Sequence, residues 1–197
     1  VQTCALPIYA IDSYREAVRL PEGFGGYARL ELARTYARMG NVDEALSEFE
    51  DLAYRFPADI AAPALYHSAQ TRLTLAEKLD RDNSPNAAAR SRDEARRELA
   101  RLTTLYSVPD FSPLPEQAYI LVAELTEDDQ KAVENWLLEL PERFPDSAYA
   151  TFAKAEAARR TGKPEEAKFH FRKLSEQTLD PFLEDKRQQL GKQLGGS

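Results

Sequence analysis

The stretch VDEALSEFEDL, residues 42–52, decides the fold that this sequence predicts. It places the small residue Ala45 first, the large Phe49 four residues later, and Leu52 three residues after that. Steps of four and three residues keep side chains on one face of an α-helix. The small residue lets a neighbouring helix approach closely, and the large residues fill the space between the helices. The stretch therefore predicts a helix that packs against a neighbour along one face.

The same spacing recurs along the chain. In each copy, a small or slim residue is followed by a large apolar residue and then by a leucine. The further copies are Ala95/Leu99/Leu102, Val133/Leu137/Leu140 and Ala167/Phe171/Leu174, with a weaker one at Ala10/Tyr14/Ala17. A pattern that repeats in this way is typical of a helical repeat protein, in which each unit packs on its neighbours.

Glycine separates the two helices of a repeat. Gly40 and Gly162 each follow a helical segment, and we expect them to close it in the left-handed conformation. Asn41 then stands at the start of the next helix, with Glu44 three residues on, so we expect the two to form a capping box. This punctuation predicts pairs of helices joined by tight turns.

The order of helix, glycine turn, helix and proline resembles the tetratricopeptide repeat. Residues 26–59 match its pattern best, at Leu32, Ala33, Tyr36, Gly40, Ala45, Phe49 and Pro57. Arg29 stands where the pattern has a large apolar residue, and Ala158 stands where the fourth copy would have a tyrosine. The resemblance implies an all-α fold, a right-handed α-α superhelix. It would hold about four helix pairs, a partial N-terminal repeat and a C-terminal capping helix.

The repeat period is irregular. The small residues Ala45 and Ala95 are 50 positions apart, whereas Val133 and Ala167 are 34 apart. We place the first excess in a polar loop at residues 80–86, after a helix over residues 60–79, and the second in a proline-rich loop at residues 108–115. Both are interpreted as loops within one solenoid domain over residues 9–194. That domain would end in a capping helix at residues 182–194, followed by a frayed tail at residues 195–197.

The first eight residues, VQTCALPI, are unlike the rest of the chain and contain its one cysteine. They resemble a translated sequencing-library adapter, so we exclude residues 1–8 from the fold and interpret the chain as a fragment of a longer protein. The alternative is a genuine N-terminus with Cys4 as an acylated residue. We expect the first natural helix at about residues 9–19, and no regular packing before it.

The composition agrees with a helical chain that does not bind nucleic acid. Ala, Leu, Glu and Arg, which favour helices, dominate the sequence. The 33 acidic and 26 basic residues give a net charge of −7, which disfavours a phosphate backbone as partner. No apolar run approaches the roughly 18 residues that span a bilayer.

The sequence predicts no catalytic, cofactor or metal site. His67 has no Cys or second His near it in sequence, and we interpret it as a core or groove-edge histidine. His170 lies between Phe169 and Phe171, and we interpret it as an outward-pointing residue without a functional role. The acidic run at residues 127–129 is interpreted as stabilising a helix start. The arginine cluster at residues 90–101 is interpreted as a salt-bridged surface, and Trp136 as core packing. Phosphate-binding glycine loops, nucleophile elbows and zinc-protease motifs do not occur.

The resemblance places a partner-binding surface on the concave face, which the first helix of each pair lines. The positions that it implies are Tyr27, Leu30, Arg34, Ala37 and Arg38 in the best repeat, and Tyr149, Phe152, Glu156, Arg159 and Arg160 in the fourth. Each set combines an aromatic residue with two arginines, which are favoured at interface hot spots. We expect such a surface to bind a peptide that carries carboxylates. The sets lack the Lys and Asn of repeats that clamp a C-terminal carboxylate. The alternative is that these arginines only bridge to glutamates on adjacent helices.

The predicted function is that of a protein-interaction scaffold that binds a protein or peptide, and not that of an enzyme. The Arg-Phe-Pro motifs at residues 55–57 and 143–145, followed by Ala-rich helices, resemble bacterial envelope repeat proteins, including lipoproteins of β-barrel assembly and of the division machinery. This resemblance favours the periplasm or the outer membrane over the cytoplasm. The alternative is a regulatory or substrate-docking segment of a larger enzyme whose catalytic domain is absent from this fragment.

Overall fold

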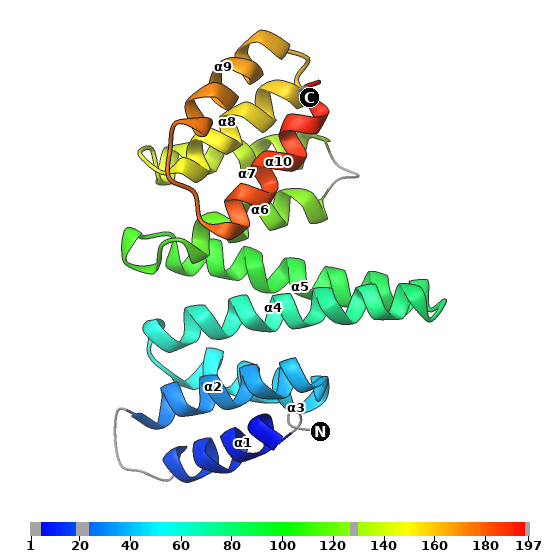
Figure 1. The fold of residues 1–197 in the computed structure, drawn as a ribbon, viewed down its shortest axis with the longest axis vertical. Helices are drawn as coiled ribbons and strands as arrows, with labels where there is room; N and C mark the ends of the chain where they lie inside the picture. Colours follow the sequence, from blue (N-terminus) through cyan, green and yellow to red (C-terminus); the bar gives the residue numbers. More distant parts are fainter. Residues whose placement is uncertain (1–4, 19–23, 127–129, 196–197) are drawn as a thin grey trace. The chain divides into compact units, whose positions relative to one another are not determined.

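The structure, a computed structural model, describes residues 5–18, 24–126 and 130–195, and within these ranges it holds helices and no strand (Figure 1). The all-α prediction is therefore confirmed. The chain divides into two compact units, Val1–Leu102 and Thr103–Ser197, and each is described by itself. The single solenoid domain over residues 9–194 stays a prediction.

The first unit is built from helices that pack in chain order. The helices are α1 (Ala5–Val18), α2 (Phe24–Met39), α3 (Val42–Arg55), α4 (Ala58–Arg81) and α5 (Pro85–Tyr106), which ends in the second unit. α1 packs on α2, α2 on α3 and α3 on α4. α2 also contacts α4, so the first helices of two successive pairs lie side by side.

The second unit repeats this arrangement. Its elements are a 3-10 turn (Pro109–Phe111), α6 (Leu114–Leu125), α7 (Gln130–Arg143), α8 (Ala148–Arg160), α9 (Pro164–Ser175) and α10 (Pro181–Gln193). α6, α7, α8 and α9 pack in chain order, and α10 contacts both α8 and α9. The capping helix predicted at residues 182–194 is thus α10.

The spaced triples form the cores of both units. Ala45, Phe49 and Leu52 are 0% exposed, as are Ala95, Leu99 and Leu102, and Val133, Leu137 and Leu140 are at most 2% exposed. In the fourth triple, Ala167 and Leu174 are buried and Phe171 is half-buried. A Cβ atom at Gly191 of α10 would come within 3.0 Å of the Phe171 ring, so a glycine lets α10 approach this side of α9.

Both glycine turns have the predicted form. Gly40 and Gly162 have φ angles of 81° and 71°. The amide of Asn41 donates to the Tyr36 carbonyl oxygen over 3.0 Å, and the amide of Lys163 donates to the Ala158 carbonyl oxygen over 2.9 Å. This is the six-residue closure in which a left-handed residue satisfies the last carbonyls of a helix.

Two local expectations need correction or completion. Asn41 occupies the N-cap position of α3, but its side chain makes no capping hydrogen bond. Arg29, at the position expected to be apolar, forms ion pairs of 2.6 Å with Glu48 and with Asp51 of α3. Its guanidinium also lies 5.6 Å from the centre of the Phe56 ring. Charge pairing with α3 therefore takes the place of apolar packing at this position.

The polar loop predicted at residues 80–86 is wrong in extent. α4 continues to Arg81 and α5 begins at Pro85, so the connection is short and turns at Asn83, whose φ is 55°. The additional residues of the period lengthen both helices instead. Polar side chains hold the two helices together, since Arg92 pairs with Asp80 and Ser91 donates a 2.8 Å hydrogen bond to the Arg72 carbonyl oxygen. The proline-rich segment at residues 108–115 is a loop up to Pro113, where it gives way to α6.

The N-terminal helix also begins earlier than predicted. α1 starts at Ala5, so residues 5–8 are helical, although we expected the first helix to begin at about residue 9 and no regular packing before it. Alanine and leucine favour a helix, and proline is tolerated in its first turn. Residues 1–4 and Arg19 lie outside the described ranges. The adapter origin of residues 1–8 stays a prediction.

We expect Ala45→Leu and Ala167→Leu to lower the free energy of unfolding by about 1–3 kcal/mol each, because a larger side chain overpacks a contact between close helices. Both alanines are 0% exposed. Chemical denaturation measures the effect. Ala89→Leu, at an exposed position of α5, is the matched control and should change stability by less than about 0.5 kcal/mol. Equal effects at all three positions would show that the buried alanines do not set the helix spacing.

Candidate functional site

A groove opens on the side of the first unit where α2 and α4 lie next to each other. Its volume is about 520 Å³, which is within the range of sites that hold ligands. We call it the α2–α4 groove and define it by Arg34, Ala37, Arg38, Gly40, Val42, Phe49, His67, Gln70, Thr71, Thr74, Leu75, Lys78 and Arg81. Apolar side chains of α2, α3 and α4 line part of the groove. No Asp or Glu is among the lining residues.

Four cationic side chains line the α2–α4 groove. Arg34 pairs with Glu31 on its own helix at 2.5 Å. Arg38 donates a hydrogen bond of 3.1 Å to the Thr35 hydroxyl. Among the residues that the structure describes, no carboxylate lies within ion-pair distance of Arg38, Lys78 or Arg81. Three of the four cations of the groove therefore have no carboxylate partner in the described part of the chain.

His67 is the titratable residue among these cations. Its ring centre lies 6.1 Å from that of Phe49, and its Nδ1 lies 3.2 Å from the Gln70 amide oxygen. Burial, and then the charge of Arg34, lower the pKa of the imidazole below its ordinary value. The neutral form therefore prevails at pH 7 in the empty groove.

The binding residues predicted in the best-matching repeat, residues 26–59, separate into two groups. Arg34, Ala37 and Arg38 line the groove together. Tyr27 is 48% exposed, lies outside the groove and donates a hydrogen bond to Asp59. Leu30 is 6% exposed and belongs to the core. The helical register therefore brings the two arginines to a common surface, whereas Tyr27 and Leu30 lie away from it.

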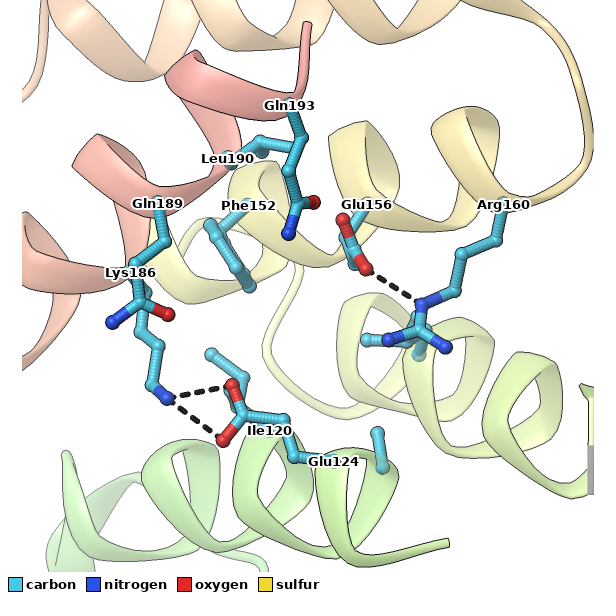
Figure 2. Close-up of a pocket in the computed structure, with 11 residues that line it drawn as sticks. Ile120, Glu124, Phe152, Glu156, Arg160, Lys186, Gln189, Leu190 and Gln193 are labelled. Carbon is cyan, nitrogen blue, oxygen red and sulfur yellow. Dashed lines mark hydrogen bonds and ion pairs between the residues drawn. The ribbon is translucent and has the colours of Figure 1, made fainter. Parts of the chain in front are cut away.

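A second, smaller pocket lies in the second unit (Figure 2). Its volume is about 250 Å³. We call it the α8–α10 pocket and define it by Ile120, Ala123, Glu124, Leu137, Phe152, Glu156, Arg160, Lys186, Gln189, Leu190 and Gln193. The lining comes from α6, α7, α8 and α10, so the C-terminal helix helps to build it.

Ion pairs neutralise the charges of the α8–α10 pocket. Lys186 contacts both carboxylate oxygens of Glu124, at 2.6 and 2.7 Å, across the pocket wall (Figure 2). Glu156, which is 8% exposed, accepts hydrogen bonds from Arg159 at 2.7 and 2.8 Å and from Arg160 at 2.6 Å. The pocket therefore differs from the α2–α4 groove, because its acidic and basic groups are paired with each other.

The predicted residues of the fourth repeat are only partly brought together. Phe152, Glu156 and Arg160 line the pocket, whereas Tyr149 and Arg159 do not. Tyr149 is 5% exposed, and its hydroxyl is 2.5 Å from Asp180 and 2.9 Å from the Gln117 amide nitrogen. Its ring stacks on Phe182 of α10. The start of α10 thus covers Tyr149, which we expected to face a partner.

The sequence analysis did not identify several residues that line the α2–α4 groove and the α8–α10 pocket. Arg81 of α4 stands in the segment that we expected to leave the helix. Lys78 lies within the predicted helix, but we assigned that helix no binding role, so the common face of the two with Arg34 and Arg38 was not foreseen. Lys186 and Gln189 lie on the capping helix, to which we assigned no binding role. The long α4 and the position of α10 place these residues.

Other candidate residues have structural roles. Trp136 is half-buried, and its ring centre lies 5.7 Å from that of Tyr119. His170 lies on α9 with its ring against Phe169. The acidic run at residues 127–129 lies outside the described residues. Among the described residues, no cluster of three or more His, Cys, Asp or Glu could hold a metal ion, and no helix is long and apolar enough to cross a membrane.

We expect Glu156→Gln to lower the free energy of unfolding by about 1–3 kcal/mol, because it removes the charge that two arginines share in a largely buried position. Thermal and chemical denaturation measure the change. Glu166→Gln is the control, since Glu166 is half exposed and pairs with Lys163 at 3.5 Å, and it should cost less than about 0.5 kcal/mol. An equal loss in both variants would contradict the structural role of Glu156.

Comparison with known proteins places the first repeat in a family. A family model described as Tetratricopeptide repeat matches residues 27–59, which run from the first turn of α2 to the start of α4. A search of the curated proteins found no match. Repeats of this family bind proteins or peptides and are typically non-catalytic. The chain is therefore an all-α helical repeat protein with a tetratricopeptide repeat at residues 27–59.

Proposed function

We propose that this chain is a protein-interaction scaffold that binds an acidic segment of a partner protein in the α2–α4 groove. The observation that carries the proposal is the charge of the groove. Four cationic side chains line it, no lining residue is acidic, and Arg38, Lys78 and Arg81 have no carboxylate partner among the described residues. An anionic partner would supply the missing charge.

The apolar lining favours a peptide over a simple anion. Val42, Phe49 and Leu75 lie among the cations, so an apolar side chain could be buried while carboxylates reach the rim. Such a combination of a central apolar anchor and a charged rim is typical of protein interfaces. The net charge of −7 disfavours nucleic acid as the source of the negative charge.

The α8–α10 pocket is a weaker candidate for the binding of carboxylates than the α2–α4 groove. Its charges are paired within the protein, and α10 occupies the side from which a partner would approach Tyr149. We therefore assign the recognition of carboxylates to Arg34 and Arg38 rather than to Arg159 and Arg160, which share Glu156.

The proposal extends to a place of action in bacterial envelope assembly. It rests on the Arg-Phe-Pro motifs at residues 55–57 and 143–145, which resemble those of envelope repeat proteins. Sequencing the reading frame upstream of residue 9 tests this part. A signal peptide there would support it, and a catalytic domain there would replace it with the role of a docking segment.

We expect the double variant Arg34→Ala/Arg38→Ala to lose partner binding. Truncation of one interfacial arginine costs on the order of 1–2 kcal/mol, so two should weaken binding by more than about tenfold. Affinity capture identifies the partners of the parent chain, and calorimetry then compares the affinities of the variants.

The control double variant is Arg96→Ala/Arg97→Ala, which removes the same charge from α5, where both arginines pair with Asp93. It should retain every partner with an affinity close to that of the parent. If the groove variant also retains every partner, the α2–α4 groove is not the binding surface.

A further inference from the structure

The cations of the α2–α4 groove form two pairs on two helices. Arg34 and Arg38 are four residues apart on α2, and Lys78 and Arg81 are three residues apart on α4. Each spacing keeps its pair on one helical face. α3 adds the apolar side chains of Val42 and Phe49 to the lining. The groove therefore offers cationic groups from α2 and from α4 together with an apolar surface.

The α4 pair remains unneutralised for a structural reason. Asp80 lies between Lys78 and Arg81 in sequence, but its carboxylate pairs with Arg92 of α5. Within the part of the chain that the structure describes, the Arg81 side chain donates only to the Glu77 carbonyl oxygen, at 3.3 Å. Lys78 is exposed, and its ammonium group has no hydrogen-bond or ion-pair partner among the described residues. Further back on the same helix, Arg72 pairs with Glu94 and Glu98 of α5. α5 thus neutralises one part of α4 and leaves the groove end cationic.

His67 lies close to these charges. The groups that face it are Arg34 and Glu31 from α2, the Phe49 ring from α3, and Gln70 and the Tyr66 ring from α4. The Arg34 charge opposes protonation of the imidazole, whereas Glu31 favours it. A carboxylate that binds next to Arg34 would offset the opposing charge.

We propose that the groove holds an acidic segment of a partner between the Arg34/Arg38 pair and the Lys78/Arg81 pair, and that His67 takes up a proton when the segment binds. The inference rests on the proposed function and adds two points to it. α4 supplies half of the specificity for carboxylates, and binding is linked to pH.

The sign of the linkage follows from the charges. In the empty groove the pKa of His67 lies below its ordinary value, and a bound carboxylate raises it. The complex therefore binds more protons than the separate partners at pH values between the pKa of His67 in the free chain and its pKa in the complex. Affinity should rise as pH falls from 7.5 to 6.0, by at most about tenfold per pH unit for one proton.

The test uses synthetic peptides of twelve residues that carry a leucine flanked on both sides by pairs of glutamates at varied spacing. Matched peptides with glutamine in place of glutamate are the neutral controls. Fluorescence anisotropy measures the dissociation constants of the full chain at pH 7.5 and 6.0. Calorimetry in two buffers of different ionisation enthalpy measures the protons that are taken up.

Two variants, each with a control, separate the contribution of the α4 cations from that of His67. Lys78→Gln/Arg81→Gln should weaken acidic-peptide binding by about tenfold or more, and Lys168→Gln/Arg172→Gln on α9 removes the same charge elsewhere and should not. His67→Gln should abolish proton uptake and the pH dependence of affinity. His170→Gln, which alters the other histidine of the chain, should leave both unchanged. Circular dichroism of each variant verifies that it is folded.

The outcomes distinguish the two proposals. If no acidic peptide binds better than its neutral counterpart, the proposed function and this inference both fail. If acidic peptides bind and depend on Arg34 and Arg38, but neither on Lys78 and Arg81 nor on pH, the proposed function stands and this inference is overturned. Loss of pH dependence in His170→Gln rather than in His67→Gln would also overturn it.

Discussion

Close approach of helices at small residues is the constraint on which the first unit depends. Ala33 of α2 and Ala45 of α3 are 0% exposed, and α2 packs on α3. At Gly26 of α2, an added Cβ would come within 2.7 Å of the Phe56 ring and would also strike Ile60 of α4. These contacts bring the faces of α2 and α4 to one groove. Side chains that would be spread over separate surfaces in a looser bundle thus become the walls of one site.

The helix pairs could be predicted because their signals are local. The triples that include Ala45 and Val133 define one apolar face each, and Gly40 and Gly162 end helices for a backbone reason that does not depend on partners. The lengths of α4 and α5 could not be predicted, because an excess in the repeat period fits a loop and a longer helix pair equally well. Contacts between α4 and α5, such as the Arg92–Asp80 pair, favour the longer helices over a loop. Sequence alone does not show these contacts.

The same holds for the candidate site: its residues could be predicted where local register places them, but not where contacts between helices do. Arg34 and Arg38 follow from the register of a single repeat, and they do line the groove. Arg81 depends on the continuation of α4 beyond the predicted helix, and Lys78 lies on a predicted helix to which no binding role was assigned, so both were missed. Tyr149 was assigned to a binding face because the register of α8 allows it, but Phe182 and Asp180 cover it. Within a repeat, register can be read from the sequence, whereas coverage by a later helix depends on tertiary packing.

The positive groove does not result from a shortage of acidic residues. The chain has 33 acidic residues against 26 basic ones, and in the first unit Arg29, Arg55, Arg72, Arg92 and Arg96 each pair with a carboxylate. Asp80 lies between Lys78 and Arg81 in sequence, but it pairs with Arg92 of α5. A local positive field on an acidic protein attracts an anionic segment to one place and repels it elsewhere. The excess of negative charge outside the groove therefore favours docking of the segment in the groove over docking elsewhere. Salt should weaken this electrostatic attraction, because Lys78 and Arg81 are exposed.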